Sequence, residues 1–546
     1  MMLDSDPTSR SRPLTQRSGL RLLASASAFA LLLAGCASPT PTANRGEQMV
    51  DPEPLTSQAP AGFESYYGQT IDWSECEAGQ VTPALMAAPE DLGYYQCGTL
   101  DAPMNWDDPD SEPIELAVAR YLGAPEDGER PPLFYNLGGP GGGAVESLSA
   151  VVANIVTDQV AQAYNIVALD PRGVGASSPI WCMTDEERDA DNAREVDVAD
   201  MSLDERVAWN DAEIATIGNQ CLERNGEILG FVDSDSAARD FDMTRAVLGA
   251  ETMDYLGFSY GTLLGAIYAD LFPDHVGRFV LDGVLDPAMN LNEVSAAQIA
   301  GMEASLYNWI ETCVTGKNCP LGSTLEEGKE TMVKFFEDVA ASPLPTADPQ
   351  RPLTEGLANT AVIGTLYSTD SYQLLTQAMA QALEGDGSML LFLADYFNDR
   401  GEDGVFMSNQ SDAFLAVNML DYEPVGTPEQ WEAEAQQIAA ANPILGADYG
   451  FASAGISQWP VESRAPRRSI QAQDAPEMLL IGTTHDPATP FVMAENLHKE
   501  IPNTTLLTVE GWNHTAYSAS ASSCVRGVVD RFLLNGELPE DGTVCD

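Results

Sequence analysis

A short apolar run, 253–258, leads directly into a serine that lies between two glycines. The residues at 257–261 are Gly-Phe-Ser-Tyr-Gly, and the segment that follows, 262–271, is rich in small and apolar residues. This order predicts a buried strand, a sharp turn and a helix. Glycines on both sides allow such a turn to close without a steric clash, which exposes the hydroxyl of Ser259. A lone match of this kind is common by chance, so its meaning depends on the rest of the chain.

Short apolar runs alternate with helical patterns along much of the sequence. Runs that stay apolar on both faces are typical of parallel strands covered by helices on both sides. We expect strands at 114–122, 133–137, 165–169, 253–258, 278–284, 478–481 and 504–509. The pattern predicts an α/β fold with a mostly parallel central sheet.

Two stretches interrupt this rhythm. Residues 182–236 are polar with a helical pattern and predict a small insertion. Residues 290–474 lack short strands and contain helical patterns, such as 327–339 and 372–383. Because this second block separates two strands of the sheet, we expect it to form a helical cap or lid domain over the active site. The catalytic core then comprises 61–289 and 475–546.

The N-terminal residues have the features of an export signal. Four arginines accompany an apolar run, 20–33, that is short for a membrane span. The run ends in Leu-Ala-Gly-Cys at 33–36, which resembles a bacterial lipobox. We therefore expect a signal peptide at 1–35, lipidation of Cys36 and a flexible tether at 36–60. The protein would be an exported cell-envelope lipoprotein that faces outside the cytoplasm and contacts the membrane only through this lipid. The alternative is an ordinary secretory signal with a chance cysteine.

The cysteine count suits an exported protein. Of nine cysteines, Cys36 is the expected lipidation site, and the other eight can form up to four disulfides. The sequence does not determine the connectivity. Nearest-neighbour pairing would join Cys76 to Cys97, Cys182 to Cys221, Cys313 to Cys319 and Cys524 to Cys545. No Cys-x-x-Cys or His-Glu-x-x-His pattern occurs, so neither a metal site nor a cofactor is predicted.

The chain is strongly acidic, with a formal net charge of −57 at pH 7. Such a charge should repel nucleic acid and anionic membrane surfaces. We therefore expect no nucleic-acid partner, and we interpret the charge as a device for solubility or for a saline habitat. The oligomeric state is not predicted.

A catalytic serine needs a base, and the chain has only four histidines. His514 follows the last expected strand, and Asp486 follows the strand at 478–481. The chain order Ser259, Asp486, His514 is that of α/β-hydrolases, in which the acid orients the base. We predict these three residues as nucleophile, acid and base. Of the other histidines, we expect 275 at the surface or packed, 498 solvated and 485 near the cleft.

A glycine cluster early in the predicted sheet offers hydrogen-bond donors. The residues at 136–143 are Asn-Leu-Gly-Gly-Pro-Gly-Gly-Gly, directly after an expected strand. Backbone N–H groups at such a place can stabilise the oxyanion of a tetrahedral intermediate. We predict that the N–H groups of Gly139 and Tyr260 form the oxyanion hole. A phosphate-binding loop is the rival interpretation, but no Gly-Lys-Ser/Thr follows.

Five motifs together resemble the secreted tripeptidyl aminopeptidase family of α/β-hydrolase serine exopeptidases, which is related to the proline iminopeptidases. They lie at 138–142, 170–175, 257–261, 486–490 and 511–514. The resemblance extends from about residue 66 to 545 and is least marked in the cap. It implies removal of short peptides, tripeptides above all, from substrates with a free N-terminus through an acyl-enzyme. It also implies a structural role for Asp-Pro-Arg at 170–172.

Two other functions remain open at this stage. A carboxylesterase that acts on small acyl esters uses the same triad and oxyanion hole. A catalytically silent surface binding protein is disfavoured, because all three triad residue types and the oxyanion glycines are present. A peptidase of this kind also needs a carboxylate that receives the substrate ammonium, and the cap has too many acidic residues for the sequence to identify it.

Overall fold

The computed structural model describes residues 52–83, 86–123, 130–196, 201–447 and 449–546. The expected signal peptide and Cys36 lie outside these residues, as does most of the tether. The described end of the tether packs on the core, since the N–H of Leu55 donates to the carbonyl oxygen of Ala246 at 2.9 Å. Part of the range expected for the tether is therefore packed on the core. No helix of the described segments is long and apolar enough to cross a membrane.

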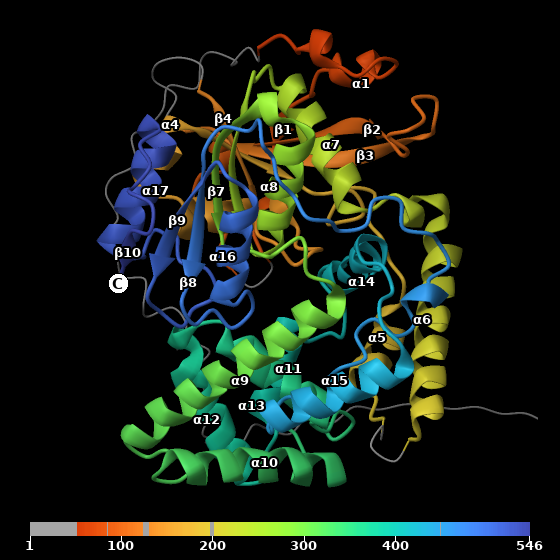
Figure 1. Cartoon of the computed structure of the whole chain (residues 1–546), viewed down its shortest axis with the longest axis vertical. Coiled ribbons are helices and arrows are strands. Elements are labelled where there is room, and N and C mark those ends of the chain that lie inside the picture. Colours follow the sequence, from red (N-terminus) through yellow and green to blue (C-terminus); the bar gives the residue numbers. More distant parts are fainter. Residues whose placement is uncertain (1–51, 84–85, 124–129, 197–200, 448) are drawn as a thin grey trace, which may run out of the picture. The chain divides into compact units, whose positions relative to one another are not determined.

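The described strands form one ten-stranded sheet in the order β1-β2-β3-β5-β4-β6-β7-β8-β9-β10 (Figure 1). The strands are β1 Ser74–Glu75, β2 Tyr95–Pro103, β3 Pro113–Tyr121, β4 Pro132–Asn136, β5 Asn165–Leu169, β6 Met253–Phe258, β7 Val276–Asp282, β8 Met478–Thr483, β9 Thr504–Val509 and β10 Val544–Cys545. β1, β2 and β3 pair antiparallel, and all neighbours from β5 to β10 are parallel. The predicted α/β fold with a mostly parallel sheet is confirmed.

All seven expected strands are present, with ends that differ by at most two residues from the expected ones. Three further strands were not expected. β1 and β10 have only two residues each, and β2 contains Gly98, Asp101 and Pro103, which are rare in strands. Pairing with β3 along all nine residues holds β2 extended despite this composition.

Helices cover both faces of the parallel part of the sheet. Side chains of α7, α8 and α16 join the hydrophobic cluster on one face, and those of α3, α4 and α17 join the cluster on the other. β8 is buried along its whole length, with Met478 and Leu480 in the first cluster and Leu479 and Ile481 in the second. These helices are α3 Ala144–Ala150, α4 Asp158–Ala163, α7 Ser234–Val247, α8 Tyr260–Leu271, α16 Phe491–Glu500 and α17 Ser523–Asn535.

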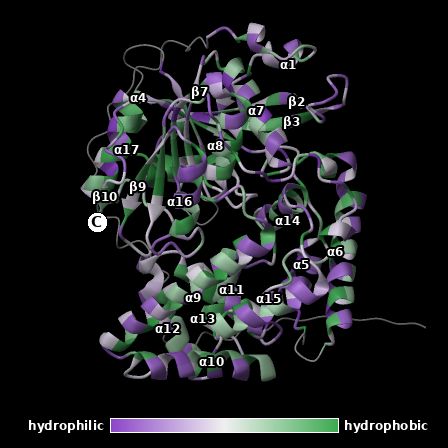
Figure 2. Cartoon of the chain, in the orientation of Figure 1, coloured by the Kyte–Doolittle hydropathy of each residue, from purple (hydrophilic) through white to green (hydrophobic). Residues whose placement is uncertain are grey.

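The hydropathy pattern agrees with this layering. Figure 2 shows hydrophobic residues along the central strands, whereas helices at the surface, such as α6 and α10, carry both hydrophobic and hydrophilic residues. A one-sided apolar stripe is what a helix needs when one face packs and the other meets water.

A long helical region separates β7 from β8 in the sequence; we call it the helical insert. It contains α9 Leu291–Thr315, α10 Leu325–Ala341, α11 Glu355–Leu366, α12 Tyr372–Leu383, α13 Ser388–Phe397, α14 Gln410–Asp421 and α15 Pro428–Ala441. Most of these helices share a hydrophobic core of their own, separate from those of the sheet. α14 differs, because Ala416, Val417 and Leu420 belong to the cluster on one face of the sheet.

A smaller excursion lies between β5 and α7, within the range expected for the first insertion. It contains α5 Asp185–Asn192 and α6 Leu203–Asn225. Two short helices, α1 Glu64–Tyr67 and α2 Ala78–Val81, precede the main strands.

Four disulfides link parts of the described chain, with the nearest-neighbour connectivity. They join Cys76 to Cys97, Cys182 to Cys221, Cys313 to Cys319 and Cys524 to Cys545. Disulfides persist in oxidising compartments and are rare in the cytosol. This chemistry therefore indicates an exported protein.

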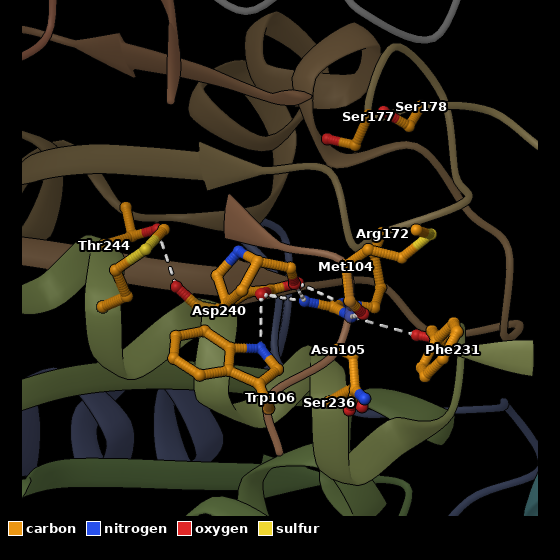
Figure 3. A network of polar contacts seen from close by, with 12 residues as sticks. Met104, Asn105, Trp106, Arg172, Ser177, Ser178, Phe231, Ser236, Asp240 and Thr244 are labelled. Atoms are coloured by element: carbon orange, nitrogen blue, oxygen red, sulfur yellow. Dashed lines mark hydrogen bonds and ion pairs between the residues drawn. The ribbon is translucent and has the colours of Figure 1, made fainter. Parts of the chain in front are cut away.

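A buried ion pair fixes the turn that follows β5 (Figure 3). The Arg172 guanidinium donates to both carboxylate oxygens of Asp240 at 2.7 and 2.6 Å, and both side chains are fully buried. The Trp106 indole N–H also donates to Asp240, at 3.0 Å. Arg172 uses its remaining N–H groups on the carbonyl oxygens of Pro103, Met104 and Phe231. With every donor engaged in the core, this arginine has the structural arrangement that the family resemblance implies.

Candidate active site

The serine predicted as nucleophile lies at the turn between β6 and α8. Ser259 has φ 54° and ψ −123°, a conformation that is costly for a residue with a side chain. The flanking glycines are needed because the backbone passes very close to its neighbours. A Cβ at Gly257 would lie 2.5 Å from the carbonyl oxygen of Gly261, and one at Gly261 would lie 2.4 Å from that of Asn136. The sequence motif is thus explained by a tight strand–turn–helix.

Hydrogen bonds hold this strained turn from both sides. The N–H of Ser259 donates to the carbonyl oxygen of Asp282 at 3.0 Å. The carbonyl oxygen of Ser259 accepts from the Thr262 hydroxyl at 2.6 Å and from the Thr262 N–H at 2.8 Å. The conformation of Ser259 is therefore fixed by the end of the neighbouring strand and by the first turn of its own helix.

The predicted base and acid are in contact. Nδ1 of His514 lies 2.8 Å from Oδ1 and 3.0 Å from Oδ2 of Asp486. Oδ1 of Asp486 also accepts the N–H groups of Ala488 and Thr489, and Oδ2 accepts the N–H of Thr515. A carboxylate fixed by three backbone donors can hold the imidazole in one orientation. Nε2 of His514 is then the nitrogen left for a reacting group.

Ser259 and His514 both lie near the end of β7. Ser259 donates to Asp282, and the next residue, Gly283, lies against the imidazole, because a Cβ there would be 3.2 Å from Cε1 of His514. Thr489 lies close to both, with its hydroxyl oxygen 3.4 Å from Nδ1 of His514 and 3.2 Å from the position of a Cβ at Gly283. The structure thus brings the three predicted triad residues to the same edge of the sheet, where the parallel strands have their carboxyl ends.

The electrostatic surroundings favour a charged imidazole. Burial alone would lower the pKa of His514, but attraction to Asp486, the hydrogen bond to it and attraction to Asp282 together raise the pKa above its usual value of 6.5. Such a group can accept a proton from a serine hydroxyl and is stabilised once it carries that proton.

The glycine loop after β4 packs directly on the serine turn. A Cβ at Gly138 would lie 2.9 Å from Cβ of Ser259 and 3.1 Å from the backbone nitrogen of Tyr260. Neither the N–H of Gly139 nor that of Tyr260 has a hydrogen-bond acceptor within the described part of the chain. Both predicted oxyanion donors are therefore free for a ligand.

Asp170 anchors the helix that follows this loop. Its carboxylate accepts the N–H of Val145 at 2.8 Å and that of Ala176 at 2.9 Å. Burial raises the pKa of Asp170 to about 6, although these N–H groups lower it. Glu146, one residue further along α3, is half-buried, and burial followed by repulsion from Asp170 and Asp399 raises its pKa to about 7.

The helical insert also contacts the histidine loop. The N–H of His514 donates to the carbonyl oxygen of Tyr367 at 2.8 Å, and the two rings meet edge to face at 5.3 Å. The side-chain oxygen of Asn513 accepts the N–H and the hydroxyl of Thr369, each at 2.9 Å. α14 also packs on the glycine loop, since a Cβ at Gly141 would be 2.5 Å from the carbonyl oxygen of Gln410. The insert therefore borders the site at two places.

Sequence analysis missed Asp282, Tyr367 and Thr369. Asp282 had a recognisable signal, because it is an acidic residue inside a run, 278–284, that is otherwise typical of a buried strand. Tyr367 and Thr369 had none, since they reach the site only through the packing of the insert.

The side chains of the other three histidines have partners outside the predicted triad. Nδ1 of His275 pairs with Asp242 at 2.7 Å, and His498 bonds to the Thr504 hydroxyl at 2.9 Å. His485 stacks on Trp512, with ring centroids 4.0 Å apart. The described residues contain no group of three or more histidine, cysteine and acidic side chains suited to a metal ion.

The α/β-hydrolase class is defined by a parallel sheet in which a serine turn, an acid and a histidine each follow a different strand. This chain has that arrangement. Comparison with known proteins agrees. A family model described as "alpha/beta hydrolase fold" matches residues 131–344, and one described as "TAP-like protein" matches residues 443–545.

Three relatives match most of the chain. The serine protease Hip1 of Mycobacterium tuberculosis is 30% identical over 497 residues, which cover 88% of this chain and 91% of that protein. Carboxylesterase B of the same organism is 32% identical over 482 residues, with coverages of 87% and 89%. Tripeptidyl aminopeptidase of Streptomyces coelicolor is 29% identical over 511 residues, with coverages of 87% and 86%. The chain belongs to this α/β-hydrolase family with a TAP-like C-terminal region, and it is a serine hydrolase.

Proposed function

We propose that the protein is an exported serine exopeptidase that removes short peptides, tripeptides above all, from free N-termini. Ser259 is the nucleophile, His514 the general base and Asp486 the acid that orients it. The observation that carries this proposal is the contact of Nδ1 of His514 with both oxygens of Asp486, at 2.8 and 3.0 Å, next to the strained serine turn.

In the first half of the reaction, Oγ of Ser259 attacks the carbonyl carbon of the scissile bond while Nε2 of His514 takes the hydroxyl proton. The N–H groups of Gly139 and Tyr260 stabilise the oxyanion that forms. The C–N bond then breaks, and His514 gives its proton to the leaving amine. The N-terminal fragment remains as an ester on Ser259.

In the second half, water takes the place of the leaving peptide. His514 removes a proton from this water as the water oxygen attacks the ester carbon. The C–O bond to Ser259 breaks, the serine oxygen regains a proton from His514, and the short peptide leaves with a free carboxylate. Asp486 keeps the imidazole oriented and stabilises its charged form in both halves.

Peptidase activity is supported by two of the relatives, and exopeptidase specificity by the helical insert and by one of them. The insert borders the histidine loop at Tyr367 and Thr369 and the glycine loop at Gln410, so it can close one end of the cleft. A closed end limits how many residues fit before the scissile bond. The names of Hip1 and tripeptidyl aminopeptidase identify these relatives as peptidases.

The test of this specificity is the dependence of kcat/KM on a free N-terminus. Anilides of one to four alanines, each with and without an N-acetyl group, show how many residues are released and whether a free N-terminus is required. We expect the free tripeptide anilide to be cut best. Acetylation should lower kcat/KM by about a hundred- to several-thousand-fold, because the acetylated substrate has no ammonium to pair with the buried carboxylate that an exopeptidase of this kind needs. Equal cleavage of free and acetylated substrates would contradict the exopeptidase.

A carboxylesterase is the second candidate, favoured by the relative named carboxylesterase B. The same triad and oxyanion donors serve an ester, whose alkoxide leaving group needs less assistance from His514. Rapid turnover of short acyl esters with no cleavage of any alanine anilide would favour this candidate over the peptidase.

We also propose that the mature protein begins at Cys36 and is held at the cell envelope by a lipid on that residue. The lipobox-like Leu-Ala-Gly-Cys at 33–36 supports this, and the four disulfides fit an oxidising compartment. Cys36→Ser should release active protein into the medium, because all residues of the proposed site, from Gly139 to His514, lie far beyond residue 36 in the sequence. Unchanged membrane association of that variant would contradict the anchor.

A further inference from the structure

Asp282, the last residue of β7, forms hydrogen bonds both with Ser259 and with the loop that carries His514. Its backbone carbonyl oxygen accepts the N–H of Ser259 at 3.0 Å. Its carboxylate accepts the N–H of Ala516, with oxygens at 2.9 and 3.1 Å, and the N–H of Tyr517 at 2.7 Å. These two residues follow His514 closely in the sequence. One residue therefore ties the serine turn to the loop that carries the base.

The contacts of Asp282 differ from those of Asp486. Asp486 bonds to the imidazole ring, whereas Asp282 bonds to the backbone just beyond it. Ring orientation and loop position are separate requirements, since a correctly oriented imidazole on a displaced loop would not reach Oγ of Ser259. A misplacement of about 1 Å can lower a rate by about a hundredfold.

A negative charge at this position is costly. Asp282 is fully buried, and no arginine, lysine or histidine of the described chain forms an ion pair with it. Burial raises its pKa to about 6, although the N–H groups of Tyr517 and Ala516 lower it. A neutral residue would avoid the cost of burying a carboxylate. The presence of a carboxylate here, rather than a neutral side chain, has a physical reason if its negative charge also stabilises the protonated imidazole of His514.

We infer that Asp282 is a second positioning carboxylate of the active site, which holds the His514 loop against the Ser259 turn and stabilises the charged imidazole. This inference rests on the proposed triad. Asp486 orients the ring, and Asp282 sets the distance between base and nucleophile.

The inference predicts a particular pH dependence. The titratable groups that face His514 are Asp486 from the loop after β8, Asp282 from β7 and Tyr367 from the insert. Attraction to Asp282 raises the pKa of His514, so removing that charge lowers it. Because the base must be neutral to act, the acid limb of kcat/KM should then move to lower pH. A purely structural role would leave this limb in place.

The experiment compares Asp282→Asn with the wild-type protein. The amide keeps the shape but loses the charge and one acceptor oxygen. We expect kcat to fall by about ten- to a hundredfold with little change in KM, and the acid limb to move to lower pH. The rate of fluorophosphonate labelling of Ser259 should fall in parallel, since that reagent needs the base but no peptide subsites.

Asp254→Asn is the matched control. Asp254 also lies in the sheet, on β6, where it is half-buried, and it also accepts a backbone N–H, that of Arg278 at 2.7 Å, but it lies at the opposite strand end from Ser259. This control should lower the unfolding temperature without moving the pH profile. If Asp282→Asn keeps the wild-type kcat and acid limb, or if both variants shift the limb alike, the inference is overturned.

If Asp282→Asn does not fold, the pH dependence of kcat/KM of the wild-type protein tests the inference instead. If neutral Asp282 impairs the base as the asparagine does, log kcat/KM should rise with pH with a slope above one over part of the acid limb. A slope of one along the whole limb would contradict the inference. Failure of the proposed function would look different: the wild-type protein itself would not react with a fluorophosphonate.

Discussion

Two regions of the molecule hold the loop that carries His514, and they do so with different chemistry. The sheet holds it with buried carboxylates, Asp486 on the ring and Asp282 on the backbone. The helical insert holds it with the carbonyl oxygen of Tyr367 and with an exposed contact between Thr369 and Asn513. Hydrogen bonds to buried charges contribute more than neutral ones at the surface. We therefore expect the position of His514 to depend mainly on the sheet, and the insert, which also borders the glycine loop, to contribute less.

The largest expected effect comes from breaking the hold of the sheet on the imidazole ring. Asp486→Asn should lower kcat by up to about ten-thousandfold, because the amide no longer stabilises the tautomer that leaves Nε2 free. The measurement is kcat with a free tripeptide anilide, alongside a thermal unfolding curve. A variant that folds normally and loses less than about tenfold would contradict the role of Asp486.

A second comparison uses one disulfide from each region. Cys524–Cys545 closes a separation of 21 residues beside the sheet, and Cys313–Cys319 closes a separation of only 6 in the insert. In the chain-entropy account, their loss costs about 3 and about 2 kcal/mol of unfolding free energy, respectively. Paired Cys→Ser variants followed in denaturant would measure both. A larger loss for the insert disulfide would contradict this account.

The pH dependence of the wild-type protein tests the charge around the base. The pKa of His514 is raised above 6.5, and only the neutral ring accepts a proton, so activity should be full at alkaline pH and decline as pH falls through that raised pKa. At pH 5, kcat/KM should be at least about thirtyfold lower than at pH 8. A profile that is flat down to pH 5 would mean that no such base limits the reaction.

The smallest effect is expected when the contact from the insert is broken. Asn513→Ala removes the acceptor of both Thr369 bonds and leaves the backbone bond of His514 to Tyr367 in place. We expect kcat to fall about two- to tenfold, the range for neutral hydrogen bonds. Asn496→Ala is a suitable control, because its side chain bonds to Asp286 away from the histidine loop. A loss as large as that of Asp486→Asn would reverse the ranking of the two regions.

The sheet, and the placement of Ser259, Asp486 and His514 at one edge of it, could be predicted from sequence because both depend on local signals. Buried parallel strands read as continuous apolar runs, and the glycines at 257 and 261 reflect contacts made within the turn or with the adjacent strand. β2 was missed because it is extended through pairing with β3 rather than through its own composition. The contacts of Tyr367 and Thr369 depend on how a whole helical region packs, which no short pattern encodes.

The central claim is that Ser259 is a nucleophile activated by His514. The most direct measurement is labelling of the folded protein with a fluorophosphonate, followed by mass spectrometry of its peptides. The account predicts one modified residue, Ser259, with labelling abolished in Ser259→Ala and greatly slowed in His514→Ala. Labelling that persists in Ser259→Ala, or that is unaffected in His514→Ala, would contradict it.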